Sequence, residues 1–372
     1  MRCARYLILC GWLICSLSGW SQNTKIVIPA GTPEDKDLAA IAAEPEAQKR
    51  IPLYDDFIKK YAGNNAAVAY AEWQLSQQYL SAGDTAKALE DGNKALELVP
   101  NDLDVLVSQV SVAQAMKDNG KIVDYAVRGA AVFNSISTQA KPADVPDAEW
   151  NARIAEDQES ARSNYDFLEA AAYNAIAAEQ DPGKRMTYIE LFTPAFPKSK
   201  FEPQISQLAL YSLQQLNQPQ RLEAYGEKAL AANPDSIPTL LMLANAYSED
   251  PKQVGKAVTY ANKVIALTGA NPASLDKQQT LSAGVAHSTL GYAYLKEEKL
   301  TAAVPELKTA VNMLQNDPQA QQAALFRLGY AYAKQNHRAE SVAALQKAAA
   351  IDGPYQGPAR QMLAKVSATG KQ

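Results

Sequence analysis

Residues 71–102, AEWQLSQQYLSAGDTAKALEDGNKALELVPND, decide the fold of this chain. Apolar and small residues recur in this stretch at intervals of three and four, which is the period of an amphipathic α-helix. Gly83 and Asp84 interrupt the pattern near its middle, and Pro100 and Asn101 end it. Because glycine and proline break helices, the stretch predicts two helices joined by a short turn.

The same arrangement recurs along most of the chain. From Lys36 onward the sequence is rich in alanine, leucine, lysine, glutamate and glutamine, with glycine, proline or asparagine breaks at short intervals. The pentapeptide LGYAY stands at 290–294 and again at 328–332, 38 residues later, and an alanine-rich segment follows each copy. A helical hairpin repeated at a near-constant period predicts an all-α protein whose hairpins stack on their neighbours.

The residues at particular positions of these hairpins resemble the tetratricopeptide repeat family, whose unit is a helix–turn–helix of 34 residues. Counted from residue 69 as position 1, the family's residues at positions 7, 11, 15, 20, 27 and 32 are Leu75, Tyr79, Gly83, Ala88, Ala95 and Pro100. Small residues at positions 8 and 20 let the two helices of a hairpin approach closely, and the aromatic residue at 11 fills a gap against the next hairpin. The resemblance implies a right-handed superhelix of stacked helix-turn-helix hairpins.

The template covers about three quarters of the chain. The segments that fit it are 69–102, 103–136, 166–199, 203–236, 237–271, 284–318 and 322–354. The first segment and the last two fit well. The second and third keep the register but lose most of the family's residues.

Two similar phrases, AIAAEPEAQKR at 40–50 and AIAAEQDPGKR at 175–185, stand 135 residues apart. In both, we expect the alanine-rich part to end one helix and the Lys-Arg pair to begin the next, which predicts a further hairpin over 36–63. Our hypothesis is an early duplication of a multi-repeat block; the alternative is coincidence in an alanine-rich chain.

One region breaks the period. The polar stretch 135–146 predicts a loop, and the next 33 residues, from Asp147, contain neither proline nor glycine. They are expected to form one long helix or a helix broken near Ser163 and Asn164. The expected organisation is N-terminal repeats over 36–136, a loop and linker helix over 137–163, C-terminal repeats over 164–354, and a capping helix and tail over 355–372.

The first 21 residues have the pattern of a secretory signal peptide. Arg2 and Arg5 precede an apolar core, Tyr6–Gly19, which is too short to span a bilayer comfortably. Small residues at 19 and 21 indicate cleavage after Ser21, leaving a flexible tether over 22–35 with a short strand at Lys25–Ile28. We expect an exported protein, periplasmic or envelope-associated, with no stable membrane span after cleavage; an uncleaved anchor is the alternative.

Composition excludes several classes of function. The formal net charge is −4, and it becomes −6 without residues 1–21, whereas a nucleic-acid binder needs a basic stripe. All three cysteines lie within residues 1–21, so the mature chain would have no thiol nucleophile or thiolate ligand. His287 and His337 are the two histidines, and no carboxylate pair stands at metal-ligand spacing. We therefore expect no enzyme, no metal and no cofactor, and structural or surface roles for both histidines.

The resemblance also implies where a partner would bind. In this family, positions 2, 5, 9 and 12 of the first helix of each hairpin line a concave groove. The aromatic and amide residues at such positions here are Tyr70, Trp73, Gln77, Tyr211, Gln214, Tyr292, Phe326 and Tyr330. Aromatic rings supply a large contact area at low entropic cost, and amides can hydrogen-bond an extended backbone. The alternative is that these rings pack against neighbouring repeats or the capping helix.

One mode of recognition known in the family is not expected. Some members hold a chaperone's C-terminal carboxylate with a lysine at position 5, an asparagine at position 9 and further lysines. Position 5 holds Trp73, Leu241, Ser288 or Phe326 in this chain, and Asn245 stands alone at position 9.

Three hypotheses of function follow. The first is an exported, non-enzymatic scaffold that binds a protein or peptide partner through its concave groove. The second is a fixed structural subunit of a bacterial envelope assembly complex. The third is an accessory protein that binds a glycan through the aromatic groove.

Overall fold

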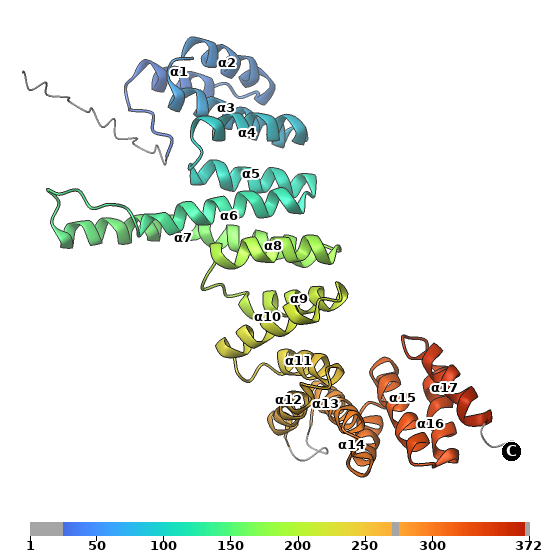
Figure 1. The fold of residues 1–372 in the computed structure, drawn as a ribbon. Helices are drawn as coiled ribbons and strands as arrows, with labels where there is room; N and C mark the ends of the chain where they lie inside the picture. Colours follow the sequence, from blue (N-terminus) through green and yellow to red (C-terminus); the bar gives the residue numbers. More distant parts are fainter. Residues whose placement is uncertain (1–24, 270–274, 369–372) are drawn as a thin grey trace, which may run out of the picture. The chain divides into compact units, whose positions relative to one another are not determined.

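The computed structural model describes residues 25–269 and 275–368, and these fold into α-helices joined by turns and loops (Figure 1). The expected signal peptide, 1–21, lies outside the described residues. Within them, no helix is both long and apolar enough to cross a membrane. The chain divides into two compact units, residues 1–175 and 176–372, and each is described by itself.

The first unit consists of helical hairpins that stack in chain order. Its helices are α1 (Pro33–Ala42), α2 (Ala47–Lys60), α3 (Asn65–Ser81), α4 (Thr85–Leu98), α5 (Leu103–Met116), α6 (Asn119–Ile136) and most of α7 (Asp147–Ala178). Each of the first six contacts the next along the chain or its hairpin partner, and α3 also contacts α5. The expected extra hairpin near the N-terminus is therefore present, as α1 and α2.

The second unit continues the pattern. Its helices after the end of α7 are α8 (Pro182–Ala195), α9 (Glu202–Gln215), α10 (Pro219–Ala232), α11 (Ile237–Glu249), α12 (Val254–Thr268), α13 (Lys277–Lys296), α14 (Leu300–Met313), α15 (Pro318–Lys334), α16 (Arg338–Ala350) and α17 (Gln356–Ala368). The first helices of successive hairpins, α9, α11, α13 and α15, contact one another in that order. We call these four helices the first-helix row.

The fold is an all-α helical repeat solenoid, as the sequence predicts. The segment from Asp147 forms one unbroken helix, the first of the two alternatives. The division between the two units falls inside this helix. The domain limits expected from the sequence stay a prediction.

Side-chain caps explain where many of the helices begin. Side-chain oxygens of these N-cap residues accept a hydrogen bond from a backbone N–H of the first turn, which would otherwise have no partner. Residues with this role are Thr32, Asn64, Asp84, Asp102, Asp118, Asp181, Asp276 and Asp317. At α13 the Gln279 side chain accepts in return from the Asp276 backbone N–H at 3.0 Å, which completes a capping box.

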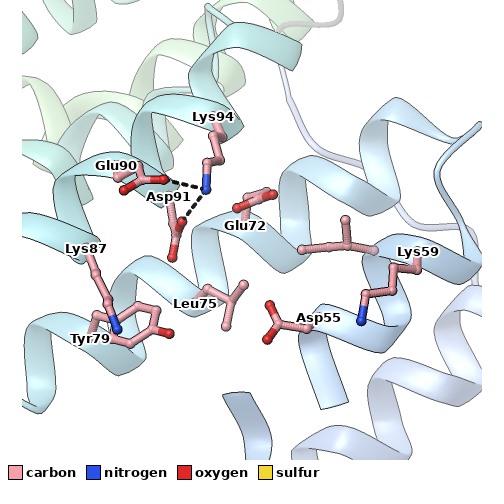
Figure 2. Close-up of a pocket in the computed structure, with 10 residues that line it drawn as sticks. Asp55, Lys59, Glu72, Leu75, Tyr79, Lys87, Glu90, Asp91 and Lys94 are labelled. Carbon is pink, nitrogen blue, oxygen red and sulfur yellow. Dashed lines mark hydrogen bonds and ion pairs between the residues drawn. The ribbon is translucent and has the colours of Figure 1, made fainter. Parts of the chain in front are cut away.

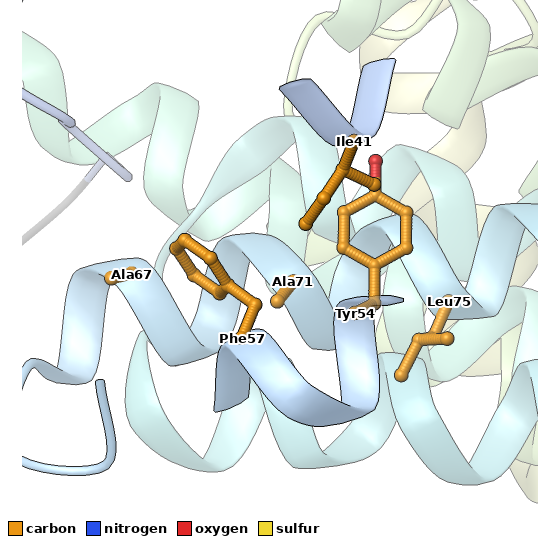
Figure 3. Close-up of a cluster of buried hydrophobic side chains, with 6 residues drawn as sticks. All are labelled: Ile41, Tyr54, Phe57, Ala67, Ala71 and Leu75. Atoms are coloured by element: carbon orange, nitrogen blue, oxygen red, sulfur yellow. The ribbon is translucent and has the colours of Figure 1, made fainter. Parts of the chain in front are cut away.

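The expected strand at Lys25–Ile28 does not form, and residues 25–269 and 275–368 contain no other strand with which it could pair. Its backbone is bound by a helix cap instead. The Ile26 N–H donates to Asp102 Oδ2 at 2.7 Å, while Asp102 Oδ1 caps α5. Ile28 packs against the apolar cluster that α1, α2 and α3 form around Tyr54 and Phe57 (Figure 3).

Small residues bring the two helices of a hairpin together at positions 8 and 20. A Cβ added at Gly329 would lie 2.6 Å from Leu345 Cγ, so only glycine fits there without displacing α16. Ser341 Oγ, at position 20, donates to the Gly329 carbonyl at 2.8 Å. In the first repeat the roles are exchanged, and Ser76 Oγ at position 8 donates to the Ala88 carbonyl at 2.7 Å.

The turn inside a hairpin also repeats. Position 15 has a left-handed backbone in five repeats, with φ between 51° and 83°, at Gly83, Lys117, Asn217, Glu298 and Asn336. The segment 103–136, which has few of the family's residues, therefore makes the same turn at the same position as the well-matched segments.

Candidate functional site

A cavity of about 300 Å³ lies on the first-helix row of the second unit. Its lining residues include Gln214, Leu241, Met242, Asn245, Val285, Ser288, Thr289, Gln319, Ala323, Arg327 and Tyr355. All but Tyr355 come from α9, α11, α13 or α15. The cavity therefore occupies the face on which the resemblance places a groove.

Arg327 on α15 is the charged residue of this cavity, and it is only 5% exposed. One guanidinium nitrogen donates to Ser288 Oγ at 3.1 Å, and another donates to Asn245 Oδ1 at 3.4 Å. The guanidinium carbon also lies 4.4 Å from the centroid of the Tyr292 ring. Its partners are thus a hydroxyl, an amide and an aromatic face.

None of the described residues provides a carboxylate within ion-pair distance of Arg327. A buried charge is costly unless it is paired and hydrogen-bonded. A guanidinium has five N–H donors arranged to match a carboxylate, and the two bonds above leave donors over. The cavity can therefore accept a carboxylate from a bound molecule.

Tyr292 on α13 packs with its ring face against the guanidinium of Arg327. Its hydroxyl donates to Glu249 Oε2 at 3.0 Å, and Lys296 lies 3.5 Å from the same oxygen. The ring is half-buried and packs against the apolar cluster that includes Leu295 and Leu328. The sequence left open whether this ring lines a groove or packs against neighbouring repeats. Tyr292 packs against the core, and it also contacts Arg327, which lines the cavity.

The other groove residues predicted in the second unit are distributed unevenly. Gln214 lines the cavity, and Phe326 lies 5.3 Å, ring to ring, from Tyr355, which also lines it. Tyr211 and Tyr330 are 50% and 36% exposed and are not among the lining residues.

In the first unit, Trp73 and Gln77 share a second cavity of about 420 Å³ with residues of α5. Tyr70 contacts Trp73 edge to face, with ring centroids 6.1 Å apart. The indole Nε1 of Trp73 is buried and has no hydrogen-bond acceptor. This face too is built from first helices, α3 and α5, and the indole N–H of Trp73 is a donor without an acceptor there.

Sequence reasoning missed Arg327, because it stands at position 6 of its repeat and only positions 2, 5, 9 and 12 were considered. The signal was a charged residue within the apolar stretch AALFRLGY. Stacking brings Asn245 to Arg327 across 82 residues of sequence, a contact that the positions within one repeat do not reveal. No lysine takes part in this arrangement.

Neither histidine belongs to a possible metal-binding group in the part of the chain that the structure describes. His287 Nδ1 lies 2.6 Å from Glu306 Oε2, which joins α13 to α14. Among residues 25–269 and 275–368, no group of three or more His, Cys, Asp or Glu could hold a metal ion.

The last complete hairpin matches a known repeat family. Residues 323–355, which span α15 and α16, match the family model described as tetratricopeptide repeat. This hairpin is a tetratricopeptide repeat. No curated protein matches it by sequence.

Three solved structures are similar to this chain at low scores. The TPR domain of P58(IPK) is 14% identical, with 92% of this chain and 100% of that chain covered and a TM-score of 0.28. PilW, a widely conserved type IV pilus biogenesis factor, is 21% identical over 66% of this chain and 98% of that chain, with a TM-score of 0.26. The TPR2AB domain of yeast Sti1, solved in a pHSP90 complex, is 15% identical over 81% and 99%, with a TM-score of 0.28. Scores this low carry no information about partners.

Folds of this family are typically non-enzymatic scaffolds for protein–protein interaction. In each unit a cavity lies on the first helices of the hairpins.

Proposed function

We propose that this chain is an exported, non-enzymatic scaffold that binds an extended segment of a protein partner on the first-helix row of its second unit. The segment carries a carboxylate, which binds to Arg327. The partner's backbone lies across Gln214, Asn245 and Gln319, whose amides can donate to and accept from it.

The single observation that carries this proposal is a buried arginine without a carboxylate in a cavity. The unfavourable free energy of burying this charge is only partly offset by Ser288, Asn245 and the Tyr292 ring. A ligand carboxylate would form charge-assisted hydrogen bonds with the donors that remain. Binding of a carboxylate would therefore offset the part of the burial free energy of Arg327 that its present partners leave uncompensated.

Export rests on a separate feature, the sequence of the first 21 residues. A positive start, a short apolar core and small residues before Gln22 have the order of a secretory signal. We propose a periplasmic or envelope-associated location for the mature chain.

A peptide selection tests the binding proposal. The purified protein is incubated with a library of random decapeptides, and the retained peptides are sequenced. The library contains each peptide with a free and with an amidated C-terminus; we expect peptides that contain aspartate, glutamate or a free C-terminus to be enriched, and an Arg327→Gln variant to lose this enrichment. Arg360→Gln is the matched control, because Arg360 is an exposed arginine on α17.

The possible results separate the three hypotheses of function. Retained peptides without a carboxylate, or equal retention by Arg327→Gln, would overturn the proposed role of the arginine. Retention of no peptide, together with a stoichiometric complex in envelope extracts, would favour the structural subunit. Retention of glycans and of no peptide would favour the glycan-binding accessory.

A further inference from the structure

A pocket of about 430 Å³ in the first unit is lined by both acidic and basic groups (Figure 2). Three helices build it: α2 contributes Asp55, Ile58 and Lys59; α3 contributes Glu72, Leu75 and Tyr79; α4 contributes Lys87, Glu90, Asp91 and Lys94. The apolar groups come mainly from α2 and α3, so the pocket has an apolar part and a charged part. None of these residues belongs to the proposed partner-binding site.

Glu72 is the unusual member of this pocket. Its side chain is nine-tenths buried, at 9% exposure, and its Oε2 atom has no hydrogen-bond partner. A carboxylate oxygen buried without a donor is unfavourable, and native structures seldom leave one so. This atom lacks a donor although the residue lines a pocket large enough to admit one.

The lysines around the pocket do not supply that donor. Lys94 binds Glu90 and Asp91, each at 2.9 Å, and these two bonds are drawn in Figure 2. Lys59 and Lys87 pair instead with Asp56 and Asp84, neither of which lines the pocket. Lys94 is therefore the one lysine bound to the pocket's own acids, which are Asp55, Glu72, Glu90 and Asp91.

The geometry favours an organic cation over a metal ion. The four acids are too dispersed for a metal, since no cluster in the described residues has metal-ligand geometry. A primary ammonium carries three donors that can reach separate acceptors, and its alkyl stem can lie on Ile58, Leu75 and Tyr79. The volume is within the range usual for small-molecule sites.

We infer that this pocket binds a primary alkylammonium group, with Glu72 Oε2 as the principal acceptor and Asp55 at the entrance. The group is the end of a lysine side chain on another protein or a free aliphatic amine, which have the same chemistry. The ammonium donates the hydrogen bond that Glu72 Oε2 otherwise lacks.

Binding should depend on pH in a way that identifies Glu72. The pKa of this carboxyl is raised to about 7, and burial is the largest cause. The positive charge of Lys94 acts in the opposite direction and lowers the pKa. The charged groups that face it are Asp55 and Lys59 from α2 and Lys87, Glu90, Asp91 and Lys94 from α4. Because the ammonium needs the ionised carboxylate, its affinity should rise about thirtyfold between about pH 5.5 and pH 8.5.

Calorimetric titration of the purified protein with cadaverine, in low salt, tests the inference. We expect saturable binding at pH 8.5, at least tenfold weaker binding by Glu72→Gln, and no pH dependence in that variant. Asp55→Asn, at an exposed position that cannot unfold the helix, should weaken binding a few fold. Glu97→Gln is the control, because Glu97 is an exposed glutamate of α4 outside the pocket.

A second variant tests the charge balance. Lys94→Gln releases Glu90 and Asp91, so it should bind cadaverine more tightly than the parent, and the amine should raise its melting temperature. A parallel titration with the peptide Ac-Ala-Ala-Lys-Ala-Ala-NH2 distinguishes the two sources: binding of the peptide indicates a lysine side chain, and binding of cadaverine alone indicates a free amine. No binding of either compound, or unchanged binding by Glu72→Gln, would overturn the inference.

Discussion

The guanidinium of Arg327 lies over the ring of Tyr292, with the guanidinium carbon 4.4 Å from the ring centroid. The two residues come from neighbouring first helices, α15 and α13, and the tyrosine hydroxyl is itself bound to Glu249 at 3.0 Å. A cation over an aromatic face in a partly dry site is stabilised by about 1–2 kcal/mol. Tyr292 thus orients the arginine, whereas the equivalent ring in the next repeat, Tyr330, remains at the surface.

The first prediction separates these two tyrosines. Tyr292→Ala should lower the free energy of unfolding by about 2 kcal/mol, because the ring packs against a buried cluster, and it should also weaken capture of carboxylate peptides. Tyr330→Ala should change stability by no more than about 0.5 kcal/mol, because Tyr330 is 36% exposed. Thermal unfolding and peptide capture, measured on both variants, check this.

Tyr292→Phe provides the control. It keeps the ring beneath Arg327 and removes only the bond to Glu249, so it should retain peptide capture. If Tyr292→Ala were as stable as the parent, the support assigned to this ring would be incorrect.

The second prediction concerns close packing inside a hairpin. A Cβ at Gly291 would lie 2.6 Å from Leu307 Cγ and 3.2 Å from the Ala303 carbonyl oxygen. Gly291→Ala should therefore destabilise the α13–α14 hairpin by about 1–3 kcal/mol. Gly255→Ala in α12 is the matched control, because no atom lies within 4 Å of its added Cβ, and it should stabilise by up to about 1 kcal/mol. Equal melting temperatures for the two variants would show that position 8 tolerates a methyl group.

The repeat register could be predicted from the sequence because it depends on local properties. Breakers such as Gly83 and small residues such as Ala88 act within one hairpin, so a single sequence reveals them. The poorly matched segment 103–136 was placed only by counting, yet Lys117 has the same left-handed backbone as Gly83. The helix starts were less certain: α13 begins at Lys277 rather than near 284, because Asp276 forms a capping box there.

The third prediction concerns the left-handed residue at position 15, in the turn inside each hairpin. Glu298 has a left-handed backbone with φ of 61°, which costs a residue with a Cβ about 1 kcal/mol relative to glycine. Glu298→Gly should therefore raise the free energy of unfolding by about 0.5–1 kcal/mol. Gly83→Ala, at the same position of its repeat with φ of 83°, should lower it by a similar amount. Chemical denaturation of both variants measures the two changes, and effects of the same sign would contradict the argument.

The candidate sites could be predicted only in part, because they depend on contacts between repeats. Positions 5 and 9 placed Trp73 and Gln77 in one cavity, since both lie on the same helix. The contact of Arg327 with Asn245, and the lack of a partner for Glu72, follow from how three or four helices stack. Stacking distances of that kind are not visible in a 34-residue pattern.

The fourth prediction concerns export. If residues 1–21 are a signal peptide, protein recovered from its native host should begin at Gln22, and it should contain no thiol because Cys3, Cys10 and Cys15 are removed. Intact mass and a thiol titration measure both properties. A mass that includes residues 1–21 would instead support an uncleaved anchor.

The fifth prediction follows from the pKa of Glu72. Burial raises this pKa from 4.5 to about 7 in the folded chain, so the folded state holds a proton that the unfolded state has already released. The favourable contribution of the protonated carboxyl is complete below about pH 4.5. It is lost as the pH rises to about 7, at a cost of up to about 3 kcal/mol.

Glu72→Gln removes this proton-linked loss while it keeps the shape of the side chain. The variant should therefore gain stability over the parent at pH 8, by up to about 2.5 kcal/mol relative to the difference at pH 5. Urea denaturation of both proteins at the two pH values measures this, with Glu97→Gln as the control, because Glu97 is exposed and should show the same difference at each pH. Cadaverine, if it binds as inferred, should reduce the advantage of the variant at pH 8, because it stabilises only the protein that retains the carboxylate. A gain that is equal at both pH values would mean that Glu72 does not titrate between pH 5 and pH 8 in the folded chain, and it would contradict a pKa of about 7.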